Sequence, residues 1–268
     1  MPATVSTVRN VVTEVLTEST TAEIAVAAIV VAAALFAFGS IYRASSVRST
    51  VLRTCGLVLA LVTLSIQVYR NGWLTRFDGP VTDWMVDHRS GALDQIAVAV
   101  TDLGSPVATA LLGITCGVLI SWRARSVVPG LIVIGTVGGA AVASTVIKAL
   151  VGRERPPTNI QVLLETGHSF PSGHVTGTAA LFGIAVLVVS IDRTPAVKRL
   201  LMLLAVTVTF LVALTRLYLG AHWLTDVIGG AILATLAVTV GGAVFLSLDG
   251  HTRRPRHAQS ETRDRAFV

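Results

Sequence analysis

The sequence predicts an all-α protein, a polytopic bundle of transmembrane helices, and three observations lead to this prediction. Of the 268 residues, 53% are hydrophobic and 13% are charged, and that charged share is about half that of a soluble domain. The mean hydropathy is +0.73. Apolar runs of roughly 20 residues, the length that crosses a bilayer, recur along the chain. The composition therefore excludes a soluble globular domain and a disordered chain.

Seven runs are expected to cross the membrane: 22–42, 51–69, 105–121, 127–147, 173–191, 200–215 and 227–247. The residues before them are polar and carry Glu14 and Glu18 with only one base, Arg9. A cleavable signal peptide has a basic start, so the first run is expected to remain as a helix. The expected organisation is a polar segment (1–21), N-terminal transmembrane helices (22–74), a core (75–247) and a basic cytoplasmic tail (248–268).

The charges indicate the orientation, because cytoplasmic segments carry an excess of Lys and Arg. With the N-terminus outside, the inner segments hold 13 basic and 4 acidic residues, and the outer ones hold 8 basic and 11 acidic residues. The net charge of +6 therefore reflects membrane topology, and no nucleic-acid partner is expected. Arg253, Arg254 and Arg256 in the tail are expected to face anionic lipids of the inner leaflet.

Two short interfacial segments are expected between the second and third runs, at about 80–90 and at about 93–103, where the second leads into the third run. In the first, Val81, Trp84, Met85 and His88 share one helical face, and Asp83 and Asp87 lie on the other. This pattern is typical of a helix in the membrane interface. The two cysteines, Cys55 and Cys116, are too few for a disulfide framework and are expected to be buried thiols.

The outer segment between the fourth and fifth runs combines cations with a helix start. It begins with Lys148, passes Arg155-Pro156 and ends at Pro171-Ser172-Gly173-His174. Pro followed by Ser is a typical signal for a helix N-terminus. The free backbone N–H groups there can bind an anion. Ser172 adds a hydroxyl, and Gly173 permits a close approach to the backbone.

A second outer cluster lies between the sixth and seventh runs. Arg216 ends the sixth run, and His222 and Asp226 stand at the start of the seventh. These last two residues are four apart and so share one helix face. A carboxylate in that place can hold an imidazole in one tautomer and stabilise its charged form. The imidazole itself can then act as a nucleophile.

Together the two clusters indicate phosphoryl chemistry. Lys148, Arg155 and Arg216 surround a helix N-terminus, which suits a highly charged tetrahedral anion. No carboxylate cluster points to a metal, and no cofactor is expected. Taken singly, the lysine could be a snorkelling anchor and Asp226 could complement a helix dipole. The joint pattern on one membrane face favours the site.

The residues quoted above, from Lys148 with Arg155-Pro156 to Asp226, resemble the three-part signature of the type 2 phosphatidic acid phosphatase superfamily. That superfamily includes membrane lipid phosphatases and vanadium haloperoxidases. The resemblance covers roughly residues 75–247. Six spans are usual there, so it implies a six-helix phosphatase core with an extra N-terminal span. The third motif usually opens with Ser; Thr215 keeps the hydroxyl and is expected to have a small effect.

The resemblance implies the role of each site residue. His222 attacks phosphorus and forms a phosphohistidine, Asp226 orients it, and His174 protonates the leaving oxygen and then activates water. The phosphoryl oxygens are held by Lys148, Arg155, Ser172, Gly173 and Arg216. Outside the signature, His88, Arg153, Glu154 and His168 are expected to be loop surface, although Glu165 or His168 could shape access of the substrate.

Three classes of function follow. The first is a phosphatase acting at the outer face on a lipid phosphate or diphosphate, with polyprenyl diphosphate favoured and phosphatidylglycerophosphate and phosphatidic acid as rivals. The second is a phosphotransferase, in which an alcohol resolves the same phosphohistidine. The third is a non-catalytic lipid-binding or transport protein. A haloperoxidase is disfavoured because those members resemble soluble chains, and a transporter is disfavoured because the ionisable groups lie at helix ends.

Overall fold

A computed structural model describes the backbone of residues 3–41 and 46–264 and the side chains of residues 22–41 and 46–248. All regular secondary structure in this part of the chain is helical. The long helices are α1 (Ala3–Ile41), α2 (Val47–Tyr69), α3 (Asp78–Asp87), α4 (Gly91–Leu103), α5 (Pro106–Ala124), α6 (Val128–Val151), α7 (Gly173–Val189), α8 (Pro195–Tyr218) and α9 (Leu224–Asp264). Short 3-10 turns lie at Trp73–Phe77 and Thr158–Ile160.

The prediction of an all-α bundle of membrane helices is confirmed. Each of the seven apolar runs falls on one helix, and six of these helices are long and apolar enough to cross a membrane. The seventh, α7, has 17 residues, which corresponds to a rise of about 26 Å. The two interfacial segments expected at about 80–90 and 93–103 form α3 and α4.

The structure adds two details to the expected organisation and corrects one expectation. The N-terminal segment is helical from Ala3 onward, as part of α1, and α9 continues through the tail to Asp264. The side chains of Arg253, Arg254 and Arg256 lie outside the described residues. Cys55 is exposed on α2 instead of buried, and Cys116 is half-buried.

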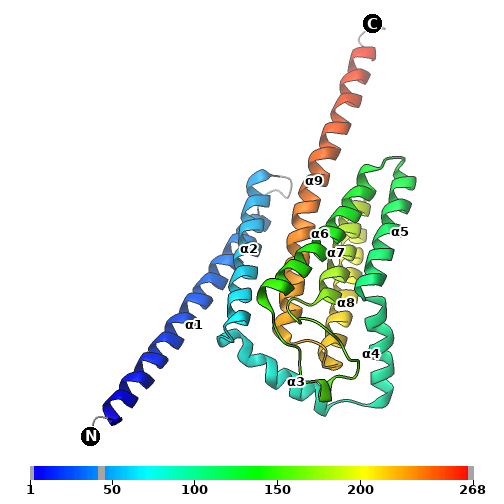
Figure 1. The fold of residues 1–268 in the computed structure, drawn as a ribbon. Coiled ribbons are helices and arrows are strands. Elements are labelled where there is room, and N and C mark those ends of the chain that lie inside the picture. The colour runs from blue at the N-terminus through cyan, green and yellow to red at the C-terminus, as the bar shows by residue number, and fades with distance from the viewer. Residues whose placement is uncertain (1–2, 42–45, 265–268) are drawn as a thin grey trace.

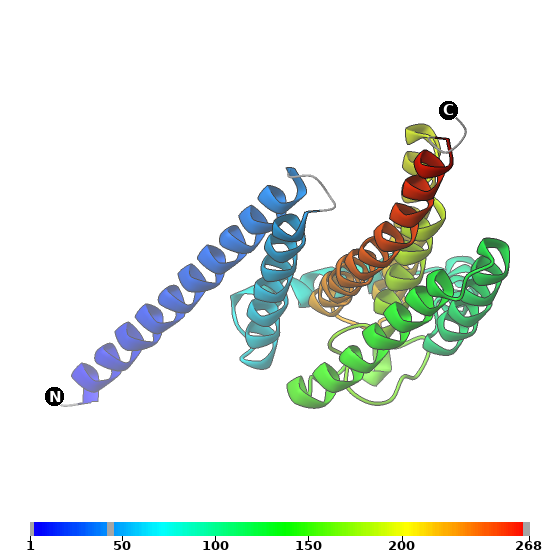
Figure 2. The same cartoon turned by 90° about the horizontal axis from the view of Figure 1, so that it is seen from above.

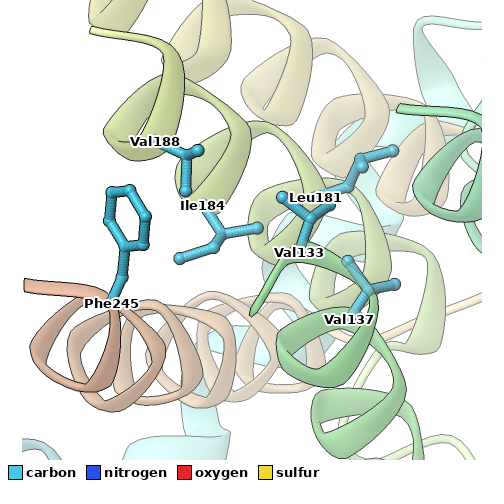
Figure 3. Close-up of a cluster of buried hydrophobic side chains, with 6 residues drawn as sticks. All are labelled: Val133, Val137, Leu181, Ile184, Val188 and Phe245. Carbon is cyan, nitrogen blue, oxygen red and sulfur yellow. The ribbon is translucent and has the colours of Figure 1, made fainter. Parts of the chain in front are cut away.

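Helix α7 is the centre of the bundle, since it packs against α5, α6, α8 and α9. Figure 3 shows the largest apolar cluster, in which side chains of α6, α7 and α9 meet: Val133, Val137, Leu181, Ile184, Val188 and Phe245. Close packing of this kind fixes the helices relative to one another. The α1–α2 hairpin stands at one side of the bundle, and α2 packs against α9 (Figures 1 and 2).

Several helices begin where the sequence supplies a capping hydroxyl. Ser105 accepts a hydrogen bond from the Ala108 N–H at 3.2 Å, and Pro106 follows as the first residue of α5. Thr194 and Pro195 form the same pair at the start of α8. Such caps satisfy N–H groups that have no partner within the helix.

The apolar face predicted for residues 80–90 divides between two environments. Met85 is buried and packs with Val81 against side chains of α7, α8 and α9. Trp84 and His88 are exposed, and their rings stack with centroids 4.3 Å apart. Helix α3 therefore lies on the end of the bundle, with only one edge turned away from it.

The connections gather at the two ends of the bundle. The first residues of α1, the α3–α4 segment and the loop that joins α6 to α7 lie at one end, and α9 runs to the other (Figure 1). This arrangement puts the two motif-bearing segments at the same end of the molecule.

Candidate active site

Three chain segments meet at that end: the end of α6 with its following loop, the start of α7, and the connection from α8 to α9. Arg216, His222 and Asp226 are each at most 1% exposed, and Ser172 and His174 are buried as well. Gly220 turns the chain between α8 and α9 at φ +67°, and a Cβ there would lie 2.6 Å from the Ile160 carbonyl oxygen. The turn directs His222 into the bundle and away from the surface.

His222, in the turn just before α9, and Asp226, in the first turn of α9, form a buried pair, whereas the sequence predicts both on one helix face. The imidazole Nδ1 lies 3.2 Å from Asp226 Oδ2, which also accepts a hydrogen bond from the Trp223 N–H at 2.9 Å. A carboxylate accepts and does not donate, so Nδ1 carries the proton and Nε2 keeps a lone pair. Burial lowers the pKa of His222 to about 4; the charge of Arg216 adds to this effect and Asp226 opposes it. The imidazole is therefore neutral at physiological pH and available as a nucleophile.

Arg155 stands directly in front of that nitrogen. Its Nη1 lies 3.3 Å from His222 Nε2 and donates to the Ala221 carbonyl at 2.9 Å. Its Nε donates to the Gly167 carbonyl at 3.0 Å. The guanidinium is thus held by backbone oxygens at the position where a phosphoryl group approaching Nε2 would develop negative charge.

Arg216 is the most deeply buried cation of the site. Its Nη1 donates to the Thr101 hydroxyl at 2.8 Å, and its Nη2 pairs with Glu165. Its Nε has no hydrogen-bond partner among the described residues. The Ser172 hydroxyl, at the start of α7, is also buried without a partner. Buried polar atoms without partners are uncommon, and two in one site indicate a place for a polar ligand.

Glu165 brings a carboxylate to these cations from the loop between α6 and α7. It pairs with Arg216 and lies 3.6 Å from Arg155 Nη2. Burial alone would raise the pKa of this carboxyl, but the charges of the two arginines outweigh it and hold the pKa below its usual value. Glu165 is therefore ionised and places its negative charge where phosphoryl oxygens are expected.

Lys148, in the last turn of α6, points across the loop. Its Nζ donates to the carbonyl oxygens of His168 at 2.6 Å and Ser169 at 3.2 Å. It shares a cleft of about 270 Å³ with Gly173, the first residue of α7. Only one side-chain atom, Pro106 Cγ at 3.7 Å, would meet a Cβ on Gly173, so the backbone at this helix start is open to approach.

The prediction that Arg153 belongs to the loop surface is wrong. Its Nη1 donates to Asp226 Oδ1 at 2.7 Å and its Nη2 to Asp78 Oδ2 at 2.5 Å. The Thr225 hydroxyl joins the same group, 2.6 Å from Arg153 Nη1 and 2.8 Å from Asp78 Oδ2. The sequence carries no signal for this role, because the partner of Arg153 could not be recognised. Asp78 begins α3, far from both motifs, and no spacing relates it to them.

Three other residues singled out from the sequence have simpler contacts. Glu154 and His168 are exposed and contribute backbone carbonyls, to the Trp223 indole N–H and to Lys148 respectively. Thr215 donates its hydroxyl to the Val212 carbonyl of its own helix at 2.7 Å. Within the described part of the chain, no group of three His, Cys, Asp or Glu side chains could hold a metal ion.

Comparison with known proteins bears on this arrangement. The sequence profile of the PAP2 superfamily matches residues 129–246, a range that contains every signature position from Lys148 to Asp226. Just under half of the chain, with the whole signature, therefore matches the PAP2 superfamily. This confirms the resemblance inferred from the sequence.

Individual relatives of the PAP2 chain are bacterial. This chain is 26% identical over 182 residues to phosphatidylglycerophosphatase B of Bacillus subtilis (strain 168). The aligned residues make up 67% of this chain and 88% of that protein. The crystal structure of a transmembrane PAP2-type phosphatidylglycerolphosphate phosphatase from Bacillus subtilis aligns with a TM-score of 0.66 at 24% identity, over 75% of this chain and 98% of that chain. LpxE of Aquifex aeolicus aligns with a TM-score of 0.44 at 23% identity, over 64% of this chain and 95% of that chain.

The chain is a multi-pass membrane protein, and its PAP2 matches indicate a lipid phosphatase.

Proposed function

We propose that this PAP2 protein hydrolyses a lipid phosphate through a phosphohistidine on His222. The single observation that carries the proposal is the geometry of the buried His222 imidazole, which Asp226 fixes at Nδ1 and Arg155 faces at Nε2. A lone pair directed at a cationic pocket is the arrangement that nucleophilic attack on a phosphoryl group needs.

The reaction proceeds in two displacements. His222 Nε2 attacks phosphorus, the P–O bond to the lipid breaks, and His174 gives its proton to the leaving oxygen. Water then attacks the phosphohistidine, His174 takes the proton of the water, and the P–N bond breaks to release inorganic phosphate. Asp226 holds the Nδ1 proton throughout and stabilises the positive charge that develops on the ring.

The cations and the start of α7 bind the phosphoryl oxygens. Arg155 and Arg216 supply guanidinium donors, Lys148 supplies an ammonium group, and Ser172 and Gly173 supply the hydroxyl and the helix N-terminus. The unpartnered Arg216 Nε and Ser172 Oγ support this assignment, because bound oxygens would satisfy both atoms. Positive charge from three side chains fills the role that a metal ion has in other phosphatases, so the proposed reaction is metal-independent.

A cleft between α5, α6 and α7 supports a substrate with a lipid tail. It measures about 270 Å³, and small or apolar residues such as Ala110, Gly113, Val137 and Gly138 line most of it. Lys148 and Gly173 stand at the end where the phosphate site lies. A lipid entering from the bilayer can therefore place its tail among the helices while its phosphate reaches His222.

The site is proposed to act at the extracytoplasmic face, with the C-terminus in the cytoplasm. The excess of basic residues in the segments at the other end supports this orientation. The lipid phosphatase core is assigned to residues 75–247, with the helices of 22–74 added before it and the basic tail after it.

Two substrates lead the candidates. Phosphatidylglycerophosphate is supported by the names of the Bacillus relatives. Polyprenyl diphosphate remains the hypothesis drawn from the sequence, because an outward-facing site suits recycling of such a carrier. The test is phosphate release by the purified protein in nanodiscs from a panel of these lipids and phosphatidic acid, with His222→Ala as the control.

Hydrolysis of at least one lipid phosphate, with phosphate trapped on histidine after an acid-free quench, is the expected result. Transfer of the phosphoryl group to an added lipid alcohol in preference to water would make the protein a phosphotransferase. Failure to turn over any lipid of the panel would reject the proposed function.

A further inference from the structure

The cleft between α5, α6 and α7 holds one hydroxyl that the reaction scheme does not use. Thr109, Thr145 and Thr176, which also line the cleft, all donate their hydroxyls to backbone carbonyls. Among the described residues that line it, Ser144 alone has a hydroxyl without a partner. The residue is only 3% exposed.

A helical serine or threonine usually satisfies itself on the carbonyl four residues earlier. Thr145, the neighbour of Ser144, does this with the Ala141 carbonyl at 3.0 Å, and Ser65 on α2 does it with the Leu61 carbonyl at 2.7 Å. Ser144 does not. Leaving a buried hydroxyl unpaired costs free energy, so its Oγ is expected to have a partner in the working protein.

The position of Ser144 indicates which part of a bound lipid is nearest to it. It lies four residues before Lys148 on α6, which is one helical turn, or about 6 Å along the axis. Both residues line the same cleft, Lys148 at the phosphate end. Ser144 thus lies beside the part of a bound lipid that is about one turn below the phosphate.

Lipid phosphates differ chemically at that depth. A glycerol-based lipid carries ester and backbone oxygens a few bonds from its phosphate, whereas a polyprenyl chain has only carbon and hydrogen there. We propose that the Ser144 hydroxyl binds an oxygen of the glycerol backbone and so selects glycerol-based lipid phosphates over polyprenyl phosphates. This proposal rests on the proposed lipid phosphatase function and names the substrate class of the same site.

The proposed selectivity follows from the free-energy cost of a buried hydroxyl that has no hydrogen-bond partner. A polyprenyl occupant would fill the cleft and leave the Ser144 Oγ desolvated without a hydrogen bond, while a glycerolipid would satisfy it. Sites built around a buried polar group discriminate against ligands that lack the matching group.

The test compares two monophosphates, so that the leaving group is an alkoxide in both: dioleoyl phosphatidic acid and a polyprenyl monophosphate. In Ser144→Ala, kcat/KM for phosphatidic acid is expected to fall about three- to tenfold, the effect of losing one hydrogen bond to an uncharged oxygen. The value for the polyprenyl substrate is expected to stay the same or rise. The ratio of the two values, measured in one preparation, does not depend on the fraction of folded protein.

Ser65→Ala is the matched control, because it removes a helical serine hydroxyl that is already bonded within its own helix and does not line the cleft. Its ratio is expected to equal that of the wild type. Ser144→Cys, which keeps the side-chain size and weakens the hydrogen bond, gives a second measurement and is expected to shift the ratio in the same direction.

Two failures are distinguishable. A wild-type protein that hydrolyses neither lipid contradicts the proposed phosphatase function. A wild-type protein that hydrolyses them while Ser144→Ala leaves the ratio unchanged, or lowers both values equally, overturns the assignment of Ser144 and leaves the phosphatase intact.

Discussion

Arg153 and Asp226 form a buried ion pair behind the nucleophile, with 2.7 Å between Arg153 Nη1 and Asp226 Oδ1. Asp226 Oδ2 faces His222, and Asp78 holds the other end of the guanidinium. The carboxylate is therefore fixed from both sides, and its orientation toward the imidazole does not depend on His222 alone. Arg153 touches no reacting atom and acts as a positioning residue.

Replacing Arg153 with Met should lower kcat by about 100-fold, because small displacements of a catalytic group cost that much. It should also move the acid limb of the kcat/KM profile. Asp226 raises the pKa of His222, and Arg153 offsets part of that negative charge, so its removal should raise the pH at which His222 becomes protonated and inactive. The pH profile of the variant measures this shift.

Arg89→Met is the control for a purely structural loss. Arg89 binds the carbonyls of Tyr218 and Ile160 at the same end of the bundle and does not contact Asp226. It should reduce thermal stability without moving the acid limb. An unshifted limb in Arg153→Met would refute its positioning role.

Glu165 competes with the substrate for Arg216 and Arg155. Because its pKa is held below the usual value, the carboxylate is charged at neutral pH and must be displaced when a phosphoryl group binds. Glu165→Gln should therefore tighten inhibition by vanadate, an analogue of the phosphoryl group, about three- to tenfold. Inhibition constants for the wild type and the variant provide the measurement.

Exposed Glu154, on the same loop, gives the matched control, because its side chain lies at the surface. Glu154→Gln should leave vanadate inhibition as it is in the wild type. Weaker inhibition in Glu165→Gln would mean that the carboxylate organises the arginines for binding instead of opposing it.

The sequence was sufficient to predict the membrane fold. The length of an apolar run is set by bilayer thickness and can be read directly from consecutive residues. The interfacial helix α3 could also be predicted from its periodicity. The exposed thiol of Cys55 could not be predicted, because in a membrane helix the lipid-facing and the buried sides are both apolar. Which side a residue takes depends on packing between helices that are distant in sequence.

The signature residues could be grouped by topology alone, because helix ends at one membrane face must lie near each other. Arg153 and Glu165 could not be placed in this way. Each acts through a partner on another segment, Asp78 in one case and Arg216 in the other. Loop residues gain such partners only from the folded geometry, and neither stands at a spacing that predicts them.

Hydrolysis is expected to continue undiminished in EDTA, and vanadate is expected to inhibit it. In the proposed site, Lys148, Arg155 and Arg216 supply the charge that would stabilise the phosphoryl group in the transition state. Phosphate release with and without chelator measures this. A loss of activity in EDTA that magnesium restores would contradict the proposed site.

Membrane topology is tested by cysteine labelling in a background without Cys55 and Cys116. Asn159→Cys, in the exposed part of the α6–α7 loop, should react with an impermeant reagent applied from outside the cell. Ser126→Cys, between α5 and α6, should react only after the membrane is permeabilised. The opposite result would place the active site in the cytoplasm.

Alanine substitutions of the two histidines should reduce activity in different ways. His222→Ala should abolish turnover of every substrate, because no phosphoenzyme can form. His174→Ala removes the general acid, whose contribution of roughly 10²–10⁴-fold depends on how basic the leaving oxygen is. A lipid monophosphate expels an alkoxide, whereas a diphosphate expels a phosphate ester and p-nitrophenyl phosphate expels a phenolate. The loss should be greatest for the lipid monophosphate and least for p-nitrophenyl phosphate.

The second displacement, hydrolysis of the phosphohistidine, gives another test of the role of His174. His174 also takes the proton from water, so His174→Ala should form the phosphohistidine from p-nitrophenyl phosphate and resolve it slowly. Stopped-flow measurement should then show a burst of phenolate close to one equivalent per enzyme, followed by slow turnover. Equal losses with all three substrates and no burst would mean that His174 binds the phosphate and does not move protons.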